Sequence, residues 1–404
     1  MAPGSGQSSR SGVEQLEELL SESVAHARER EAYALDATIG AGTPVVVFGA
    51  GGLGRKIARV LGDHGRSPLA FADNNAQLWG RQVDGISVLS PSEAAQRWGN
   101  SAAFLLAIWH PRSRSAVLEV QSQLRGLGVR LTVPFPLVFW KYPERLLPYF
   151  FWELPSKLLA EADAIRTIFG LFEDETSRAT FLSQLRLRLR ADFDGLPAPS
   201  DGLQYFPDGL FSALENEYFI DCGAYDGDSV RDFLRRTGGR FGRIAAFEPD
   251  PANFVRLRQM VEDSTELRGR TRVFPLAVDR ESGVVRFAAT GGANAAITET
   301  GEVVVECKPL DEVLAGEEPS FVKMDIEGAE RGALHGASRL IRQHHPVLAI
   351  CAYHRPDDLW EIPRLLSEME PDSRLTLRPH CADGLDLVCY AVPPARWLKG
   401  VDRN

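Results

Sequence analysis

The stretch FIDCGAYDGDSVRDFL, residues 219–234, decides the fold of the second half of the chain. It starts with an apolar run typical of a buried strand, passes through a turn that holds two glycines and three acids, and ends in a helix-like run. Glycine is favoured where a turn after a first parallel strand bends sharply and lets backbone approach a ligand. The pattern Asp221-x-Gly223-x-x-x-Gly227 therefore predicts an α/β domain with a cofactor-binding turn.

The bulk properties are those of a globular protein with two domains. The chain has 404 residues, of which 44% are apolar and 25% are charged. The formal net charge of -10 argues against a nucleic-acid partner, and no apolar run approaches the roughly 18 residues of a membrane span. Five cysteines without a CxxC pair, and a start (MAPGSGQSSRSG) without a hydrophobic signal core, predict a cytoplasmic protein with reduced thiols and a flexible leader.

Changes of pattern divide the chain into four predicted parts. Residues 1–40 contain the leader and an exposed helix at 12–37, whose leucines suggest contact with a second subunit in a homodimer. Residues 41–140 alternate strand, glycine turn, helix and strand, which predicts a Rossmann-like nucleotide-binding-type domain. Residues 141–210 hold helical patterns without convincing strands and form a helical connector, and residues 211–404 form a second α/β domain.

The end of the chain contains a hairpin signal. RLTLRPH and DLVCYAV are strand-like segments separated by CADG, and they predict an antiparallel hairpin at one edge of the second sheet. A parallel sheet that ends in such a hairpin is the arrangement of class I methyltransferases, which is an analogy at the level of the fold. The predicted fold class is therefore α/β, with two Rossmann-like domains joined by a helical connector.

An acid follows the next predicted strand at the distance expected for a ribose contact. AFEPDP places Glu248 25 residues after Gly223, where its carboxylate can accept hydrogen bonds from both ribose hydroxyls. NAD and S-adenosylmethionine both contain this ribose, so Glu248 does not separate them.

The composition of the turn favours S-adenosylmethionine. Three acids, Asp221, Asp226 and Asp228, would repel a pyrophosphate but attract an amino group and a sulfonium. The spacing also differs from the GxGxxG of dinucleotide turns. We expect Tyr225 and Ser229 of this turn to contact the cofactor as well. The alternative to a cofactor site is a sharp structural turn whose acids are solvated.

The segment FVKMDIEGAERGAL predicts a catalytic cluster. Asp325 and Glu327 follow a parallel strand at the edge where ligands bind, and Lys323 shares a strand face with Asp325. These groups could perform catalysis and orient a substrate. The alternative is that Glu327 and Glu330 favour the amino end of the next helix and Asp325 caps it.

Further candidates follow the last two parallel and edge strands. LAICAYHRPDDLW ends a strand with Tyr353, a substrate contact, and His354, which could take a proton from a substrate hydroxyl or simply pack. Asp325, Glu327 and His354 could also ligate a divalent ion, although a metal is not the expected cofactor. Arg378 and His380 lie on one strand face, where they bind an anionic substrate group or are ordinary solvated edge residues.

With these residues collected, the chain resembles the FkbM-type family of S-adenosylmethionine-dependent methyltransferases. The resemblance covers about residues 217–392 and rests on FIDCGAYDGDS, AFEPDPANF, FPLAV, VKMDIEGAE and LAICAYHRPDDLWEIPRLL. The first half of the chain resembles the amino-terminal domain of longer family members through FGAGGLGRKI, FADNN, GISVLSP and KYPERLLPY. It implies that Asp221, Gly223 and Gly227 form the methionine-side loop, that Glu248 holds the ribose, and that backbone of Leu276 and Ala277 lines the adenine. Pro275-Leu276-Ala277-Val278 lacks the acid that many class I enzymes direct at the adenine amino group.

The first domain has its own glycine turn within VVVFGAGGLGRKIARVL, residues 45–61. Gly49-x-Gly51-x-x-Gly54 follows a strand and opens a helix, and Asp73 comes 19 residues later. This context suits a nucleotide or sugar nucleotide, with phosphates at the helix amino end and the ribose on Asp73. The alternative is a turn kept for folding or subunit contacts.

The sequence thus predicts in-line transfer of a methyl group from S-adenosylmethionine, most simply to a hydroxyl of a sugar, glycolipid or natural-product acceptor. His354 or a carboxylate of the 325–327 segment would remove the acceptor proton. Two rivals are a nucleotide-dependent oxidoreductase that uses residues 45–140, and a non-catalytic nucleotide-binding protein. Neither of them requires the KMDIEGAE segment.

Overall fold

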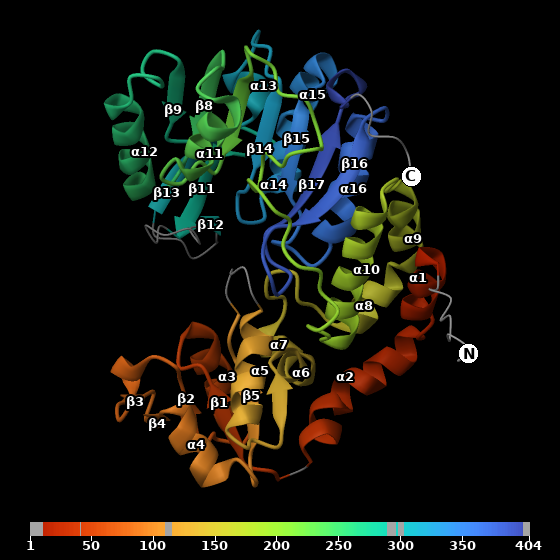
Figure 1. Ribbon diagram of the computed structural model, residues 1–404, viewed down its shortest axis with the longest axis vertical. Coiled ribbons are helices and arrows are strands. Elements are labelled where there is room, and N and C mark those ends of the chain that lie inside the picture. The colour runs from red at the N-terminus through yellow and green to blue at the C-terminus, as the bar shows by residue number, and fades with distance from the viewer. Residues whose placement is uncertain (1–10, 41, 110–114, 289–295, 298–302, 399–404) are drawn as a thin grey trace, which may run out of the picture. The chain divides into compact units, whose positions relative to one another are not determined.

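The computed structural model describes residues 11–40, 42–109, 115–288, 296–297 and 303–398, and they divide into two compact units (Figure 1). Unit 1 comprises Met1–Thr167, Arg178–Pro199 and Cys381–Leu385, and unit 2 comprises Ile168–Ser177, Ser200–His380 and Asp386–Asn404. The predicted connector at 141–210 is shared between the two units. Most of the predicted leader, residues 1–10, lies outside the described residues.

Unit 1 is built on a six-stranded sheet with the order β3-β4-β2-β1-β5-β6. All neighbouring strands are parallel except β3 and β4. The three valines of β1 are at most 1% exposed, as expected for a strand covered on both faces. The elements are β1 (Val45–Phe48), α3 (Gly52–Asp63), β2 (Ala70–Ala72), β3 (Gln82–Val83), β4 (Ile86–Leu89), α4 (Pro91–Trp98), β5 (Ala103–Leu106), α5 (Ala116–Gly126) and β6 (Thr132–Pro134).

The first two helices pack inside unit 1, which corrects the prediction of one exposed helix at 12–37. The segment forms α1 (Gly12–Leu20) and α2 (Val24–Ile39), and α2 packs on α6 and α8. Leu16, Leu19 and Leu35 are buried, so the apolar face that suggested a homodimer has partners within the chain. The other helices before β7 are α6 (Pro136–Lys141), α7 (Pro143–Leu146), α8 (Pro155–Ala160), α9 (Ala162–Leu171) and α10 (Glu175–Arg190).

Unit 2 contains a seven-stranded sheet with the order β16-β17-β15-β14-β7-β8-β9. The strands from β15 to β9 run parallel, whereas β17 is antiparallel to both β15 and β16, which confirms the predicted edge hairpin. The strands are β7 (Tyr218–Cys222), β8 (Arg243–Phe247), β9 (Thr271–Phe274), β14 (Phe321–Met324), β15 (Val347–Cys351), β16 (Arg374–Pro379) and β17 (Leu387–Val392). The helices are α11 (Asp228–Thr237), α12 (Pro251–Asp263), α13 (Leu310–Val313), α14 (Glu330–Gly336), α15 (Ser338–His344) and α16 (Asp358–Met369).

A second, smaller sheet of unit 2 has the order β10-β13-β11-β12. Its strands are β10 (Ala277–Val278), β11 (Gly283–Ala288), β12 (Ala296–Ile297) and β13 (Val303–Lys308). The sequence analysis did not predict β13. Val305 and Cys307 of this strand are buried in a small core with Ala277, and Val303 packs against that core.

Two of the whole-chain expectations, on the cysteines and on membrane spans, can be compared with the described residues. All five cysteines are free and buried, as the absence of a CxxC pair predicts. Within the described ranges, no helix combines the length and the apolar character needed to cross a membrane.

Gly223 permits a close approach between the ends of β7 and β14. These strands are paired neighbours, and the loops that follow them meet. Gly223 has φ +79°, and a Cβ placed on it would lie 1.9 Å from the carbonyl oxygen of Asp325. Both the backbone conformation and the close contact therefore require glycine.

We expect Gly223→Ala to destabilise the protein more than Gly316→Ala does. Gly316 has the same φ of +79°, but no atom lies within 4 Å of its added Cβ, so it isolates the backbone strain of about 1–2 kcal/mol. The clash at Gly223 should add about 1–3 kcal/mol. Urea denaturation of both variants measures the difference, and equal losses would contradict this account of the turn.

Candidate functional site

The predicted cofactor loop, ribose acid and catalytic residues of unit 2 lie where β7, β8, β14 and β15 end. These strands are consecutive in the sheet order and parallel, so the loops at their carboxyl ends share one edge. Parallel α/β sheets bind ligands at this edge. The edge carries the β7–α11 loop with Gly223, the acid after β8, and the clusters after β14 and β15.

The β7–α11 loop is tied to the acid after β8. The backbone N–H of Tyr225 donates to Glu248 Oε2 over 2.8 Å, and the N–H of Asp250 donates to Oε1 over 2.9 Å. Tyr225 has φ +48° and Gly227 has φ +88°. These two residues in the left-handed region bend the loop toward this carboxylate. Burial raises the pKa of Glu248 to about 7, although its hydrogen bonds, including one with the Asn253 side chain, oppose the rise.

The Glu248 carboxylate has little hydrogen-bonding capacity left for a ribose. A carboxylate accepts about four hydrogen bonds, and protein groups already supply three donors. About one acceptor position on Glu248 therefore remains free, which is fewer than the two hydroxyls of a ribose would use.

Lys323 lies beneath the β7–α11 loop and does not face a substrate as the sequence suggested. Its Nζ is 3.1 Å from Asp221 Oδ1 and donates to the carbonyl oxygens of Gly223 (2.6 Å) and Cys222 (3.3 Å). The lysine and aspartate side chains are 2% and 0% exposed. Ser229 donates to Asp221 Oδ2, so strand, loop and helix α11 meet at one buried ion pair.

The acids of this loop are partly neutralised by cations of the chain. Asp221 pairs with Lys323, and Asp226 pairs with Arg231 over 2.6 Å. Asp228 is exposed. The repulsion of a pyrophosphate that the sequence analysis inferred from three acids is therefore weaker than the bare count suggests.

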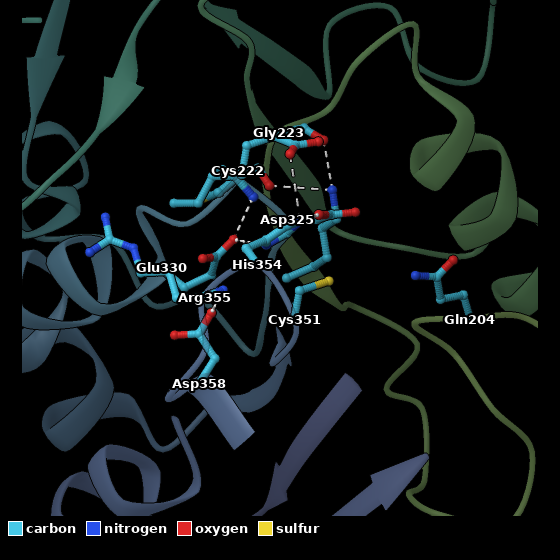
Figure 2. Close-up of polar contacts among 12 residues, drawn as sticks. Gln204, Cys222, Gly223, Asp325, Glu330, Cys351, His354, Arg355 and Asp358 are labelled. Carbon is cyan, nitrogen blue, oxygen red and sulfur yellow. Dashed lines mark hydrogen bonds and ion pairs between the residues drawn. The ribbon is translucent and has the colours of Figure 1, made fainter. Parts of the chain in front are cut away.

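Asp325, Glu327 and Glu330 surround His354 (Figure 2, in which Glu327 is not labelled). His354 Nδ1 lies 2.9 Å from Glu330 Oε1, and its Nε2 lies 3.3 Å from Asp325 Oδ1 and 3.9 Å from Glu327 Oε2. The imidazole is only 2% exposed, whereas the Asp325 and Glu327 side chains are 25% and 19% exposed. The carboxylates of Asp325 and Glu327 therefore form the accessible side of the cluster.

Burial and neighbouring charges raise the pKa values of His354 and Glu327 and lower that of Asp325. Burial alone would lower the pKa of His354, but Glu330, Asp325 and Glu327 raise it to about 10. Burial would raise the pKa of Asp325, yet His354, Lys323 and the Tyr205 hydroxyl hold it below its usual range. Burial raises the pKa of Glu327 to about 7 against the attraction of His354.

The contacts of Asp325 and Glu330 differ from the helix-capping alternative. No side chain caps α14 at its N-cap Ala329, and the Asp325 carboxylate instead faces Tyr205 and His354. Glu330 Oε1 accepts the N–H of Ile326 over 2.8 Å in addition to its contact with His354. The helix-end role is thus limited to Glu330, which also fixes the imidazole.

Tyr205 is a site residue that the sequence analysis missed. Its hydroxyl donates to Asp325 Oδ2 over 2.6 Å, and its ring lies 5.0 Å from Lys323 Nζ. Tyr205 precedes β7 in a segment without regular structure, 120 residues before Asp325. No local motif marks it, so only its position in the fold reveals its role.

Other predicted substrate residues have partners away from Asp325. Arg378 donates to Ser177 Oγ over 2.8 Å and lies 3.0 Å from Asp174, so an anionic ligand would compete with an ion pair. His380 Nε2 lies 2.7 Å from the Tyr390 hydroxyl, and burial lowers its pKa to about 4.

The remaining predicted contacts stay at the edge of the site. Tyr353 is buried with its ring 4.1 Å from that of His354. Leu276 is half-buried between β9 and β10, and Ala277 pairs with Cys307 in the small sheet.

The glycine turn of unit 1 repeats the strand-loop-acid arrangement. Asp73 Oδ2 accepts the N–H of Ala50 over 2.8 Å, as Glu248 accepts that of Tyr225 in unit 2. Gly49 has φ +104°, and a Cβ on Gly54 would lie 1.8 Å from the Gly49 carbonyl oxygen. The fold therefore requires glycine at Gly49 and Gly54. A Cβ added at Gly51, by contrast, would meet no atom within 4 Å.

The comparisons with known proteins give one match to a family model within unit 2 and one structural match over almost the whole chain. Residues 221–375 match the family model described as the methyltransferase FkbM domain. The chain is similar to a crystal structure of methyltransferase FkbM from Methylobacillus flagellatus, with 22% identity and a TM-score of 0.74 over 94% of this chain and 100% of that one. At this identity the similarity establishes the shared fold.

Two other similarities are confined to less than half of this chain. UDP-D-quinovosamine 4-dehydrogenase from Vibrio fischeri is 27% identical over 23% of this chain and 80% of that one, with a TM-score of 0.19. A methyltransferase from Podospora anserina with SAH bound is 11% identical over 44% of this chain and 71% of that one, with a TM-score of 0.26. None of the curated proteins matches the chain.

The raised pKa of Glu248 predicts a pH-dependent stability difference. Between about pH 4.5 and 7 the folded protein keeps a proton on Glu248 that the unfolded chain has lost, so raising the pH lowers the free energy of unfolding. Glu248→Gln removes this titration. Any other effect of the substitution on the free energy of unfolding does not change with pH. Urea denaturation from pH 5 to pH 8 should show wild type losing stability relative to the variant, with exposed Glu29→Gln as control. A difference that does not change with pH would contradict the buried, protonated state.

Proposed function

We propose that the chain transfers a methyl group from S-adenosylmethionine to a hydroxyl oxygen, because residues 221–375 match the model of the methyltransferase FkbM domain. The observation that carries the proposal is the contact between the glycine loop after β7 and Glu248 after β8. It joins the two groups that a nucleoside with an amino-acid tail requires, a tight loop and a ribose acid.

The donor side of the proposed site is the β7–α11 loop. Gly223 and Gly227 give backbone close access to the methionine part, and Glu248 accepts a ribose hydroxyl. Asp221 and Lys323 are buried under this loop. They contribute by fixing the position of the loop. Tyr225 and Ser229 belong to the same loop, and the backbone of Leu276 and Ala277 would border the adenine.

The acceptor side of the proposed site is the carboxylate pair Asp325 and Glu327. Their side chains are accessible, whereas His354 is enclosed behind them. We therefore assign removal of the acceptor proton to this pair. His354, whose pKa is about 10, is assigned to positioning the two carboxylates.

S-adenosylmethionine supplies an electrophilic methyl group on a sulfonium and leaves as S-adenosylhomocysteine. The acceptor oxygen forms the new bond to carbon, the carbon–sulfur electron pair returns to sulfur, and the hydroxyl proton passes to a carboxylate of the pair. The protein contributes by aligning oxygen, carbon and sulfur and by excluding water.

The proposed acceptor is a hydroxyl of a sugar, glycolipid or natural product. Members of the family that this chain resembles often methylate hydroxyls on sugars, glycolipids or polyketide natural products. A saccharide or natural-product hydroxyl suits a site that offers two partly exposed carboxylates, because hydroxyls donate hydrogen bonds to them.

Calorimetry on the full chain tests the donor site. We expect S-adenosylmethionine and S-adenosylhomocysteine to bind one per chain, and Glu248→Gln to weaken both by roughly ten- to hundred-fold through loss of charged hydrogen bonds. Asp73→Asn is the matched control, because Asp73 holds the equivalent place beside the glycine turn of unit 1.

The outcomes of this titration separate the rival functions. Equal binding of S-adenosylhomocysteine by wild type and Glu248→Gln would contradict the assigned ribose acid. Binding of NAD(H) or a uridine-diphosphate sugar alone, lost in Asp73→Asn, would place the ligand in unit 1 and favour the nucleotide-dependent alternatives.

A further inference from the structure

One nitrogen of the buried cluster lacks a hydrogen bond. His354 Nε2 is buried and has no hydrogen-bond partner among the described residues. Asp325 Oδ1 lies 3.3 Å away, within the range of a charge contact but without the alignment of a hydrogen bond. A buried polar atom without a partner costs free energy, so its persistence beside carboxylates points to a ligand that it contacts.

The opposite side of the imidazole is already fixed. Glu330 Oε1 lies 2.9 Å from His354 Nδ1 and is itself held by the N–H of Ile326. A carboxylate on one ring nitrogen fixes the tautomer that places the lone pair on the other nitrogen. When a cation replaces the proton on Nε2, the lone pair of that nitrogen faces Asp325 and Glu327.

Asp325 has a supporting contact of the same kind. Its Oδ2 accepts the Tyr205 hydroxyl over 2.6 Å, which leaves Oδ1 on the side of His354. Ligands of metal ions are typically oriented by such outer hydrogen bonds. Two neighbouring donors, Nε2 and Oδ1, thus each have a partner that fixes their direction.

The separations between donor atoms suit a bound cation. Ligand bonds of 2.0–2.2 Å place neighbouring donors roughly 3.0–3.5 Å apart, and Nε2 and Oδ1 are 3.3 Å apart. Glu327 Oε2 is 3.9 Å from Nε2 and belongs to a partly exposed side chain that can approach further. Asp325, Glu330 and His354 also bring one donor atom each within 4.8 Å of one another, but Glu330 already contacts Nδ1 and therefore acts as an outer partner and not as a ligand.

The backbone and the charge balance support the same interpretation. Glu327 has φ +55°, a conformation that costs a non-glycine residue free energy and recurs at ligand sites. Asp325, Glu327 and Glu330 face one imidazole, while Lys323 is paired with Asp221 and Arg331 with Asp357. The cluster therefore carries an excess of negative charge that a dication would offset.

We propose that Asp325, Glu327 and His354 bind a divalent transition-metal ion, with Glu330 and Tyr205 orienting two of the ligands. One imidazole with two carboxylates favours Mn²⁺ or Zn²⁺ over Ca²⁺ and Mg²⁺, which prefer oxygen ligands alone. Ion binding needs no methyl donor. Only the role of the ion rests on the proposed function: it binds the acceptor hydroxyl and lowers its pKa, and the proton passes to the Glu327 oxygen not bound to the ion.

Mn²⁺ titration of the chelator-treated full chain tests the site. Free Mn²⁺ is followed by its electron paramagnetic resonance signal, and we expect one ion per chain, displaced by Zn²⁺ but not by equimolar Ca²⁺. Asp325→Asn and Glu327→Gln should weaken binding at least ten-fold. Glu330→Gln should weaken it roughly 10–100-fold because it releases the imidazole.

Matched controls separate loss of the site from loss of the fold. His335→Ala removes an exposed histidine of α14, the helix that Glu330 begins, and should bind Mn²⁺ as wild type does. Tyr205→Phe keeps the buried ring and removes the hydroxyl. Weaker Mn²⁺ binding by this variant would therefore reflect only the lost orientation of Asp325. Circular dichroism confirms that each variant is folded.

The results distinguish failure of this inference from failure of the proposed function. Absence of a bound ion in wild type, or equal binding by Asp325→Asn and Glu327→Gln, would overturn the metal site. Binding of S-adenosylhomocysteine by the same chelated protein would leave the methyl-transfer proposal intact in that case. Stoichiometric Mn²⁺ binding without any binding of S-adenosylhomocysteine would preserve the metal site and contradict the methyl-donor site.

Discussion

The site of unit 2 depends on one buried lysine. Lys323 lies in the centre of β14, between strands that are buried on both faces, and it touches Asp221 together with the carbonyl oxygens of Cys222 and Gly223. The ring of Tyr205 lies beside the same ammonium group. A lone buried charge would be very costly, so this pair fixes the register at which the loops after β7 and β14 meet. Gly223 then allows the contact that the register imposes.

The two halves of the edge use buried charge in different ways. On the β7–β8 side, Asp221 and Asp226 are matched by cations, Asp228 is exposed, and Glu248 accepts the N–H of Tyr225. On the β14–β15 side, three carboxylates face one imidazole and the balance is negative. The first side thus suits a neutral ribose hydroxyl, whereas the second suits a cation or a group that gives up a proton.

Much of this arrangement was predictable from the sequence because it is local. The turn after β7, the acid after β8 and the edge hairpin follow from strand patterns and turn residues within a few positions. Side-chain alternation placed Lys323 on the face of Asp325, but alternation does not reveal which neighbouring strand the lysine meets. Tyr205 was missed because it lies 120 residues from Asp325 without a motif. Glu330 was identified only as a helix-end acid, since its partner His354 lies 24 residues away. The single helix predicted at 12–37 is instead two helices, α1 and α2, whose leucines such as Leu16 and Leu35 are buried within the chain.

Hydrogen exchange of the full chain with and without S-adenosylhomocysteine tests the central claim most directly, because it locates the ligand without an acceptor. The account predicts slower exchange of backbone N–H groups from residue 223 to residue 229 and beside Glu248, with no change from residue 49 to residue 54. Protection confined to the glycine turn of unit 1, or no protection at all, would contradict the assignment of the methyl-donor site to the loop between β7 and α11.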